Sequence, residues 1–429
     1  MRAVSVNACR LLLAVTFIFS GFVKAVDPTG TQIKITDYAE AMGLAGYIPD
    51  FIAMMAAVIL AAAEFTIGIA FLFAIRRKLT SQVALAVMAA FTPFTLWIAV
   101  ADPVSDCGCF GDAVKLTNWQ TFWKNTVLLS AAFVMWRRPL TVVRLIGKSN
   151  QWIVINYTVV FILFVSGYSL YYLPPFDFRP YRIGANIRQG MEMPPGKTGP
   201  QFETTFIMEK DGERKEFTLD SYPDSTWTFV DSKTVQTAEG YIPPIHDFSI
   251  VTRDGNEDIT DRVLNDKGFT FLLAAPHLET ADDSRLDMIN AVYEYAEEND
   301  IPFYCLTASG EKAMNRWQAI TGAEYPFCTT DPTTIQTMIR SNPGLILIEN
   351  GTVAGKWSCN DLPDENSLTG ILDNIRAGDT NEHSTTGKVA FIIMWYILPL
   401  FVLTLADRLW AWTKSLKRKK NSNKIYKLL

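Results

Sequence analysis

A pair of cysteines separated by a single glycine carries the clearest chemical signal in the chain. Cys107 and Cys109 lie in the stretch DCGCFGDAVKLTNW between two long apolar runs, and the whole sequence contains only six cysteines. Gly108 gives the backbone the freedom that a small disulfide ring requires. Strain in so tight a ring makes the bond easier to reduce than a structural disulfide. The spacing therefore predicts redox exchange at Cys107 and Cys109.

Three other interpretations of this pair stay open. The two cysteines can form a permanent structural disulfide, or they can remain idle thiols. They can also contribute to a metal site, because Asp106 and Asp112 flank them. Zinc usually takes four good ligands and no histidine lies near, so no metal is expected. All three histidines of the chain lie outside the apolar runs, so no haem is expected either.

An acidic residue in the middle of an apolar run is a second candidate for function. Glu64 lies within the run 51–75, where an ionisable group is costly unless it is paired or functional. Lys24 is the obvious partner from the neighbouring run. At 1.5 Å per residue, however, the two side chains are expected to differ in depth by roughly 20 Å. Thr66, a serine or a quinone oxygen are the alternative partners of Glu64.

A lysine shortly after the cysteine pair is a third candidate. Lys124 lies near one end of the run 122–136. It can extend its ammonium group to the membrane surface, as long basic side chains do at the ends of spans. Alternatively, its charge stabilises the thiolate of Cys107 or Cys109 and lowers the pKa of that thiol.

The apolar runs that hold these residues predict a membrane protein with a soluble part. At 429 residues, with 49% hydrophobic and 19% charged residues, the chain is too long and too apolar for one soluble domain. A bilayer core requires about 18 or more apolar residues per helix. We expect six spans, at residues 11–26, 51–75, 83–100, 122–136, 152–173 and 389–406. The first is expected to be retained, because no small-x-small cleavage site follows it.

The distribution of charge predicts the orientation of these spans. Lysine and arginine gather at residues 76–78, at 137–148 and in the C-terminal tail, and alternating spans place all three clusters on the cytoplasmic side. The cysteine pair and the segment 174–387 then lie on the opposite side. This segment contains 35 acidic and 17 basic residues, which argues against nucleic acid as a partner. We expect a bacterial inner-membrane protein with cytoplasmic termini, a large periplasmic domain, and a basic tail against anionic lipid.

The segment 174–387 shows alternating strand and helix patterns. The stretch TTFIMEKDGERKEFTL predicts a hairpin turning at Asp211 and Gly212. The apolar run GFTFLLAAP predicts a buried strand, and SRLDMINAVYEYAEEND has the spacing of an amphipathic helix. A second strand and helix follow, then a third strand, and the stretch NPGLILIENGTVAGKWS predicts a hairpin turning at Asn350 and Gly351.

This order of elements resembles the thioredoxin fold over residues 247–375. The resemblance implies that Pro343, which precedes the last hairpin, has a cis peptide bond and lines a groove. Where that family carries its C-x-x-C, this chain reads AAPHLETADD, with His277 and no cysteine. Without a thiolate the domain lacks the nucleophile for disulfide exchange. We therefore expect a groove at Pro343 and His277 that binds a partner protein without reacting with it.

Three cysteines remain in this domain. Cys305 lies in the middle of a predicted strand and is expected to be a packed core thiol, because free cysteine is among the most buried residue types. Cys328 and Cys359 follow predicted strands, and a disulfide between them is conceivable in an oxidising compartment. Sequence alone does not supply the Cα separation that such a bond requires.

The first 140 residues resemble the DoxX superfamily and, within it, the MauE-like branch. The resemblance is carried by FIFSGFVKAVDP, by AEFTIGIAFLF and by CGCFGDAVKLTNWQTFWKNTVLL. It implies a four-helix membrane domain linked to quinone-dependent thiol oxidation or to disulfide formation in a partner. Lys24, Glu64 and Trp119 are the candidate quinone-binding residues that it suggests.

The sequence thus predicts an all-α four-helix membrane bundle, two further transmembrane helices and an extramembrane α/β thioredoxin-like domain with a β-hairpin insertion. The expected divisions are 1–140, 152–173, 174–245, 246–386, 388–410 and 411–429. The first functional hypothesis is a membrane thiol/disulfide redox protein of the quinone-linked oxidoreductase class, in which Cys107 and Cys109 react with the help of Lys124 and Glu64. The alternative is a non-catalytic scaffold that holds another envelope protein.

Overall fold

The computed structural model describes most of the chain, in two compact units. The described residues are 2–44, 46–104, 106–199, 201–210, 213–218, 226–238, 240–377 and 385–425. The first unit comprises Met1–Arg179 and Trp357–Leu429, and the second comprises Pro180–Lys356. The expected linker segment 174–245 and most of the expected domain 246–386 therefore share the second unit.

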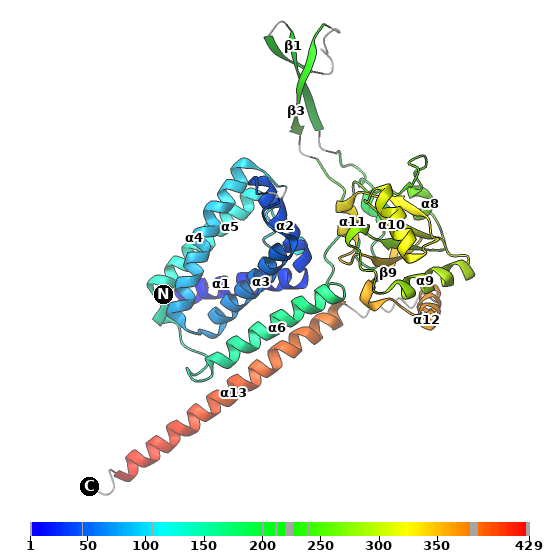
Figure 1. Ribbon diagram of the computed structural model, residues 1–429. Helices are drawn as coiled ribbons and strands as arrows, with labels where there is room; N and C mark the ends of the chain where they lie inside the picture. The colour runs from blue at the N-terminus through cyan, green and yellow to red at the C-terminus, as the bar shows by residue number, and fades with distance from the viewer. Residues whose placement is uncertain are drawn as a thin grey trace. The chain divides into compact units, whose positions relative to one another are not determined.

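The first unit is built from long apolar helices (Figure 1). Its helices are α1 (Arg2–Val26), α2 (Pro28–Ala41), α3 (Asp50–Phe73), α4 (Arg77–Ala101), α5 (Asn118–Arg137), α6 (Gln151–Tyr171), α12 (Glu365–Arg376) and α13 (Thr385–Ile425). Within the described residues, α1, α3, α4, α6 and α13 are long and apolar enough to cross a membrane. Helix α5 corresponds to the fourth of the six predicted spans. It contains polar and charged residues in its first two turns and does not meet that criterion.

The core of the bundle rests on a close crossing of α1 and α3. A Cβ atom on Gly21 would lie 2.4 Å from the backbone nitrogen of Phe65, and one on Gly68 would lie 2.6 Å from that of Ile18. Small residues permit this backbone approach, which is typical of helix pairs in membranes. Helix α5 packs against α4 and α1, and α2 packs against α3. The crossing sets the level at which side chains from α1 and α3 can meet.

Helices α6 and α13 form a second pair in the same unit and run side by side in Figure 1. The Tyr157 hydroxyl donates to the carbonyl oxygen of Trp395 over 2.8 Å, and the hydroxyls of Thr158 and Tyr396 are 2.8 Å apart. Just before the start of α6, Asp407 accepts hydrogen bonds from the backbone of Gly147 and from the Asn150 side chain. Polar contacts along the N-terminal half of α6 therefore fix the register of the two helices.

The second unit is centred on a six-stranded sheet with the order β4-β7-β6-β5-β8-β9. Its strands are β4 (Val251–Thr252), β5 (Phe269–Ala274), β6 (Phe303–Thr307), β7 (Phe327–Thr329), β8 (Gly344–Glu349) and β9 (Thr352–Ser358). Strands β5, β6 and β7 are parallel, whereas β8 is antiparallel to β5. All six residues of β5 are buried, which confirms the predicted buried strand.

Short helices connect these strands. They are α7 (Ile187–Met191), α8 (Thr260–Leu264), α9 (Leu286–Glu298), α10 (Glu311–Thr321) and α11 (Pro332–Met338). Helices α9 and α10 lie where the amphipathic spacing predicts them. Each buries an apolar stripe, because its apolar residues recur every three or four positions.

A separate three-stranded antiparallel sheet has the order β2-β1-β3. It consists of β1 (Gln201–Lys210), β2 (Glu213–Thr218) and β3 (Thr228–Ala238). The register pairs Lys210 with Glu213, as a tight hairpin requires. The predicted hairpin strands are confirmed, whereas the turn at Asp211 and Gly212 lies outside the described residues.

Candidate functional site

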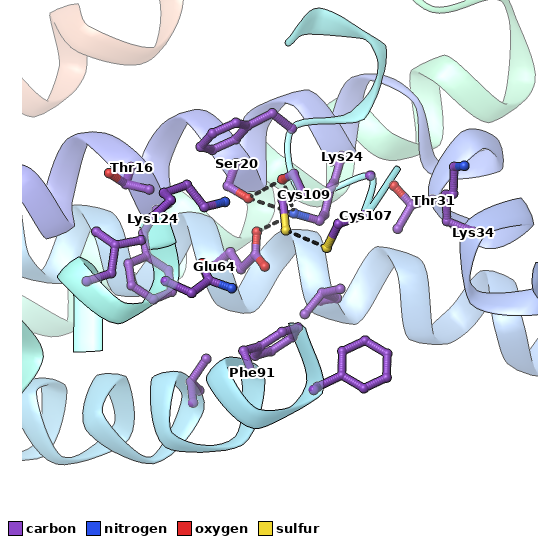
Figure 2. Close-up of a pocket in the computed structure, with 18 of the residues that line it drawn as sticks. Thr16, Ser20, Lys24, Thr31, Lys34, Glu64, Phe91, Cys107, Cys109 and Lys124 are labelled. Carbon is purple, nitrogen blue, oxygen red and sulfur yellow. Dashed lines mark hydrogen bonds and ion pairs between the residues drawn. The ribbon is translucent and has the colours of Figure 1, made fainter. Parts of the chain in front are cut away.

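The cysteine pair lies in a loop between α4 and α5 that borders a cavity in the bundle. The cavity has a volume of about 100 Å³ and is bordered by residues of α1 to α5 and of the loop (Figure 2). The ring of Phe110 anchors the loop by an edge-on contact with Phe19 of α1, with ring centroids 5.3 Å apart. The sulfur atoms thus face a confined space between helices.

The two thiols are in direct contact. The sulfur atoms of Cys107 and Cys109 are 2.9 Å apart, and both cysteines are free. Gly108 between them has a φ of +61°, a conformation that glycine adopts without the strain that a side chain would cause. The carboxylate of Asp106 accepts a hydrogen bond from the backbone nitrogen of Gly108 at 2.9 Å. The loop therefore holds both sulfurs close enough for a disulfide to form with a small movement.

Lys24 is the centre of a buried polar network beside the pair. Its ammonium group donates to Glu64 over 2.8 Å, to the Ser20 hydroxyl over 2.6 Å and to the carbonyl oxygen of Cys109 over 2.8 Å. The Ser20 hydroxyl donates to the same carbonyl over 2.7 Å. Lys24 is 6% exposed and Glu64 is 8% exposed. The network joins α1, α3 and the loop around one cation.

The expected difference in depth between Lys24 and Glu64 is wrong. It assumes that α1 and α3 end at the same level. The crossing at Gly21 instead places this part of α1 opposite Ala61 and Phe65, so Lys24 lies level with Glu64. Lys24 is therefore the partner of Glu64, and Thr66, an alternative partner, has a hydroxyl oxygen with no hydrogen bond.

Lys124 of α5 also lies near the pair. Its ammonium group is 4.2 Å from the centre of the Phe110 ring, and the residue borders the cavity. A cation over an aromatic face is held by the ring quadrupole. In Figure 2 the side chain points toward the sulfurs, so the arrangement favours the second interpretation of Lys124, in which its charge acts on the thiols.

The surroundings make the two thiols chemically unequal. The hydrogen bond from Cys107, together with Lys124 and Lys24, lowers the pKa of Cys109 to about 6, against the opposing effects of burial and Glu64. The hydrogen bond to Cys109 and burial raise the pKa of Cys107. At neutral pH the two thiols therefore hold one proton between them, and this proton resides on Cys107. At neutral pH the site holds a thiolate at Cys109, which is the reactive form of a cysteine.

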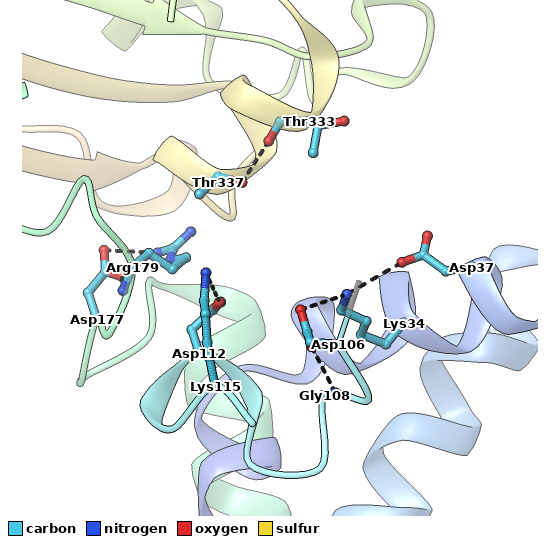
Figure 3. A network of polar contacts seen from close by, with 10 residues as sticks. All are labelled: Lys34, Asp37, Asp106, Gly108, Asp112, Lys115, Asp177, Arg179, Thr333 and Thr337. Atoms are coloured by element: carbon cyan, nitrogen blue, oxygen red, sulfur yellow. Dashed lines mark hydrogen bonds and ion pairs between the residues drawn. The ribbon is translucent and has the colours of Figure 1, made fainter. Parts of the chain in front are cut away.

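Helix α2 supplies a wall of the site that the sequence analysis does not anticipate. The Tyr38 hydroxyl donates to the carbonyl oxygen of Cys107 over 2.6 Å. Lys34 lies 3.3 Å from Asp106 and 3.9 Å from Asp37 (Figure 3). The available signal is a helix start at Asp27 and Pro28, followed by polar residues 31, 34 and 38 at helical spacing.

Trp119 and the quinone expectation fit this geometry poorly. Trp119 is 50% exposed, packs edge-on against Phe122 and is not among the residues that border the cavity. The walls suit a quinone chemically, because aromatic side chains and three lysines border the space. Its volume is smaller than the roughly 150 Å³ of an apolar cavity that holds a benzene ring. The use of a quinone therefore stays a prediction.

The predicted groove residues of the second unit lie together. The Asn342–Pro343 peptide bond is cis, as the resemblance implied. The Asn342 side chain donates to the carbonyl oxygen of His277 over 2.8 Å, which joins the loop after β5 to the proline. Cys305 is fully buried, which confirms the predicted core thiol. Cys328 and Cys359 are also buried, and no disulfide joins them.

Comparisons with known proteins support the assignment of the first helices. The model of the family described as methylamine utilisation protein MauE matches residues 2–138. These helices therefore form a MauE-like membrane region, and their apolar surfaces contact lipid. The wider DoxX resemblance stays a prediction.

The remaining comparisons concern the second unit. A domain of unknown function (DUF8463) matches residues 202–239. A solution structure described as a "putative protein disulfide isomerase" from Bacteroides thetaiotaomicron is 17% identical, with 32% of this chain and 88% of that chain covered and a TM-score of 0.24. A likeness of that size carries no argument here. No curated protein matches the chain.

Proposed function

We propose that the protein is a membrane-embedded thiol/disulfide oxidoreductase whose reactive group is the Cys107–Cys109 pair. The proposal is carried by one observation: two free thiols 2.9 Å apart lie beside a cavity that the buried Lys24 and the half-buried Lys124 border. An idle or structural pair has no use for cations placed to stabilise a thiolate. The low pKa of Cys109 favours the reduced form of the pair, so its disulfide is a good oxidant.

The reaction is a two-step exchange with a dithiol of a partner protein. A partner thiolate attacks Cys107 of the Cys107–Cys109 disulfide, and Cys109 leaves as a thiolate stabilised by Lys124 and Lys24. The second partner thiolate then attacks the partner sulfur of the mixed disulfide and expels Cys107, which takes up a proton. Two electrons pass to the pair, and the partner gains a disulfide. Exchange with a second disulfide-bearing molecule returns the pair to its oxidised form.

Lys24 and Glu64 have supporting roles in this mechanism. Lys24 holds the carbonyl oxygen of Cys109 and so fixes the loop while Cys109 is attacked or leaves. Glu64 neutralises Lys24 at 2.8 Å, which makes a buried cation tolerable within the bundle. No step is assigned to quinone, whose use stays a prediction.

The second unit supplies a platform for the partner protein in this proposal. Its sheet order, with three parallel strands and an antiparallel hairpin after a cis proline, supports a thioredoxin-like fold. Its described cysteines are buried and do not compete for exchange. The acidic composition of segment 174–387 and the basic clusters elsewhere support a periplasmic domain of an inner-membrane protein, which presents another envelope protein.

The test is a redox titration of the full-length protein in nanodiscs. The protein is equilibrated with glutathione buffers of graded ratio, quenched with acid and labelled with a maleimide that changes its mobility. We expect Cys107 and Cys109 to titrate together as a two-electron couple, and the Cys107→Ser, Cys109→Ser double variant to lose that transition. A pair that stays in one state across all buffers contradicts the proposal.

A scaffold function is the second candidate. It is favoured by the second unit, in which the loop at His277 and Pro343 keeps its geometry although it has no cysteine. The discriminating experiment is complementation of a deletion strain with the Cys107→Ser, Cys109→Ser variant. Full restoration of the wild-type phenotype supports the scaffold, whereas failure at normal protein level supports the oxidoreductase.

A further inference from the structure

Tyr38 of α2 contacts the Cys107 half of the pair. Its hydroxyl lies 2.6 Å from the carbonyl oxygen of Cys107 and it borders the same cavity. The ring packs edge-on against Phe94 of α4, with centroids 5.2 Å apart, so its orientation is fixed. The hydroxyl also hydrogen bonds to the Cys107 thiol and lowers the pKa of that thiol, against the larger raising effects of Cys109 and burial.

This contact completes an asymmetry across the site. The charges of Lys124 and Lys24 both lower the pKa of Cys109, whereas Cys107 has the charge of Lys124 and one neutral donor, Tyr38. Burial, followed by the nearby charge and hydrogen bond of Cys107, raises the pKa of Tyr38, so the phenol keeps its proton and acts as a donor throughout. That proton is donated to the Cys107 carbonyl oxygen, so the hydroxyl must turn to the sulfur to stabilise a thiolate that is expelled from Cys107.

We propose that Tyr38 is the positioning residue that assigns the two cysteines their roles. It holds Cys107 as the sulfur that forms the mixed disulfide, and it stabilises the thiolate that leaves in the second step by a hydrogen bond. The inference rests on the proposed function, since it specifies which sulfur does which part of that exchange. No proton or electron passes permanently to Tyr38, and the proton on Cys107 comes from solvent.

The expected effect can be estimated from two opposing terms. Loss of one hydrogen bond to a charged group raises the pKa of Cys107 by about one unit, which reduces its thiolate fraction about tenfold. The remaining thiolate is roughly threefold more nucleophilic, because nucleophilicity rises with pKa. The net expectation at neutral pH is a reaction about threefold slower at Cys107 and unchanged at Cys109.

The test uses single-cysteine versions of the full-length protein and the probe 4,4′-dithiodipyridine. Tyr38→Phe, which keeps the ring packing, is placed in Cys109→Ala and in Cys107→Ala, and the rate is followed against pH. We expect the pH profile of Cys107 to shift upward by about one unit and that of Cys109 to stay in place. Tyr47→Phe is the matched control, because Tyr47 is 81% exposed.

The outcomes separate the two proposals. Equal shifts at both cysteines, or no shift at either, overturn the role of Tyr38, while the wild-type redox titration still decides the proposed function. If the wild-type pair fails to titrate, the exchange reaction itself is wrong. Thermal unfolding of Tyr38→Phe confirms that any change in rate comes from a folded protein.

Discussion

Both units contain cysteines, but only in the first unit do the surroundings lower the pKa of a cysteine thiol. In the first unit, Cys109 has two lysines near it, and its pKa is lowered to about 6. In the second unit, burial raises the pKa of Cys328 to about 11, and burial also raises the pKa of Cys305. The comparison shows that reactivity follows the local electrostatics of a thiol more closely than the kind of fold that carries it.

The difference also has a structural cause. Cys305 lies within β6, where its neighbours are strand backbone and apolar side chains, so nothing compensates a charge. The cysteine pair lies in a loop, where carbonyl groups and side chains from several helices converge. Loops positioned by a rigid scaffold are where binding and catalytic residues concentrate.

Removing the sulfur pair tests the comparison most strongly. The double variant Cys107→Ser, Cys109→Ser should abolish disulfide exchange with glutathione. In Cys328→Ala the exchange rate should stay within about twofold of the wild-type rate, since the Cys328 thiol is protonated at neutral pH. Maleimide labelling after each exchange measures both. Equal loss of exchange in the two variants contradicts the assignment to the first unit.

Breaking the buried ion pair should have the next largest effect. Glu64→Ala leaves the Lys24 ammonium without its counter-charge and is expected to destabilise the fold by about 3 kcal/mol. The double variant Lys24→Met, Glu64→Leu should recover a large part of that loss, because no charge then stays buried. Thermal unfolding in detergent checks both, and a double variant that is no better than the single one argues against the pair.

The pH dependence of alkylation should follow the lowered pKa of Cys109. The wild-type protein is used for this measurement, because the Cys107→Ala variant lacks the hydrogen bond that Cys107 makes to Cys109. The rate at which Cys109 of the wild-type protein reacts with iodoacetamide should be half-maximal near pH 6 and decline below that pH, since protonation removes the thiolate. Lys124→Met should move this midpoint to higher pH, whereas Lys115→Met, at an exposed lysine, should not. An unmoved midpoint in Lys124→Met removes that lysine from the mechanism.

A substitution between the two cysteines should have the smallest effect. In Gly108→Ala the new Cβ atom would lie 3.0 Å from Cγ of Lys34, and the φ of +61° is unfavourable for alanine. We expect a cost of about 1 kcal/mol and a modest change in the redox midpoint. Gly167→Ala is the control, because nothing lies within 4 Å of its Cβ position.

Residue type alone singles out five residues that the structure places around one cavity, namely Lys24, Glu64, Cys107, Cys109 and Lys124. Each is an unusual residue for its surroundings, and such residues stand out without a structure. Tyr38 and Ser20 were not identified, because a tyrosine and a serine are ordinary in a helix and become notable only through what they contact. The depth of Lys24 was misjudged because helix crossing, which Gly21 and Gly68 determine, cannot be counted along one chain.

Residue pattern also predicts part of the second unit. Strands β5, β6 and β8 and helices α9 and α10 follow from apolar periodicity. The cis bond before Pro343 came from resemblance and not from pattern. The structure divides the chain into two units, Met1–Arg179 with Trp357–Leu429 and Pro180–Lys356, and the predicted domain boundaries stay predictions.

The glycine crossing of α1 and α3 has a mechanical consequence for access to the thiols. Where two backbones touch, no side chain lies between them to rotate aside, so this side of the cavity is rigid. The other side is formed by α2 and α4, which border the same space through larger side chains such as Tyr38 and Phe91. We therefore expect any widening of the cavity to come from displacement of α2 or α4, and not from the α1–α3 side that carries the Lys24–Glu64 ion pair.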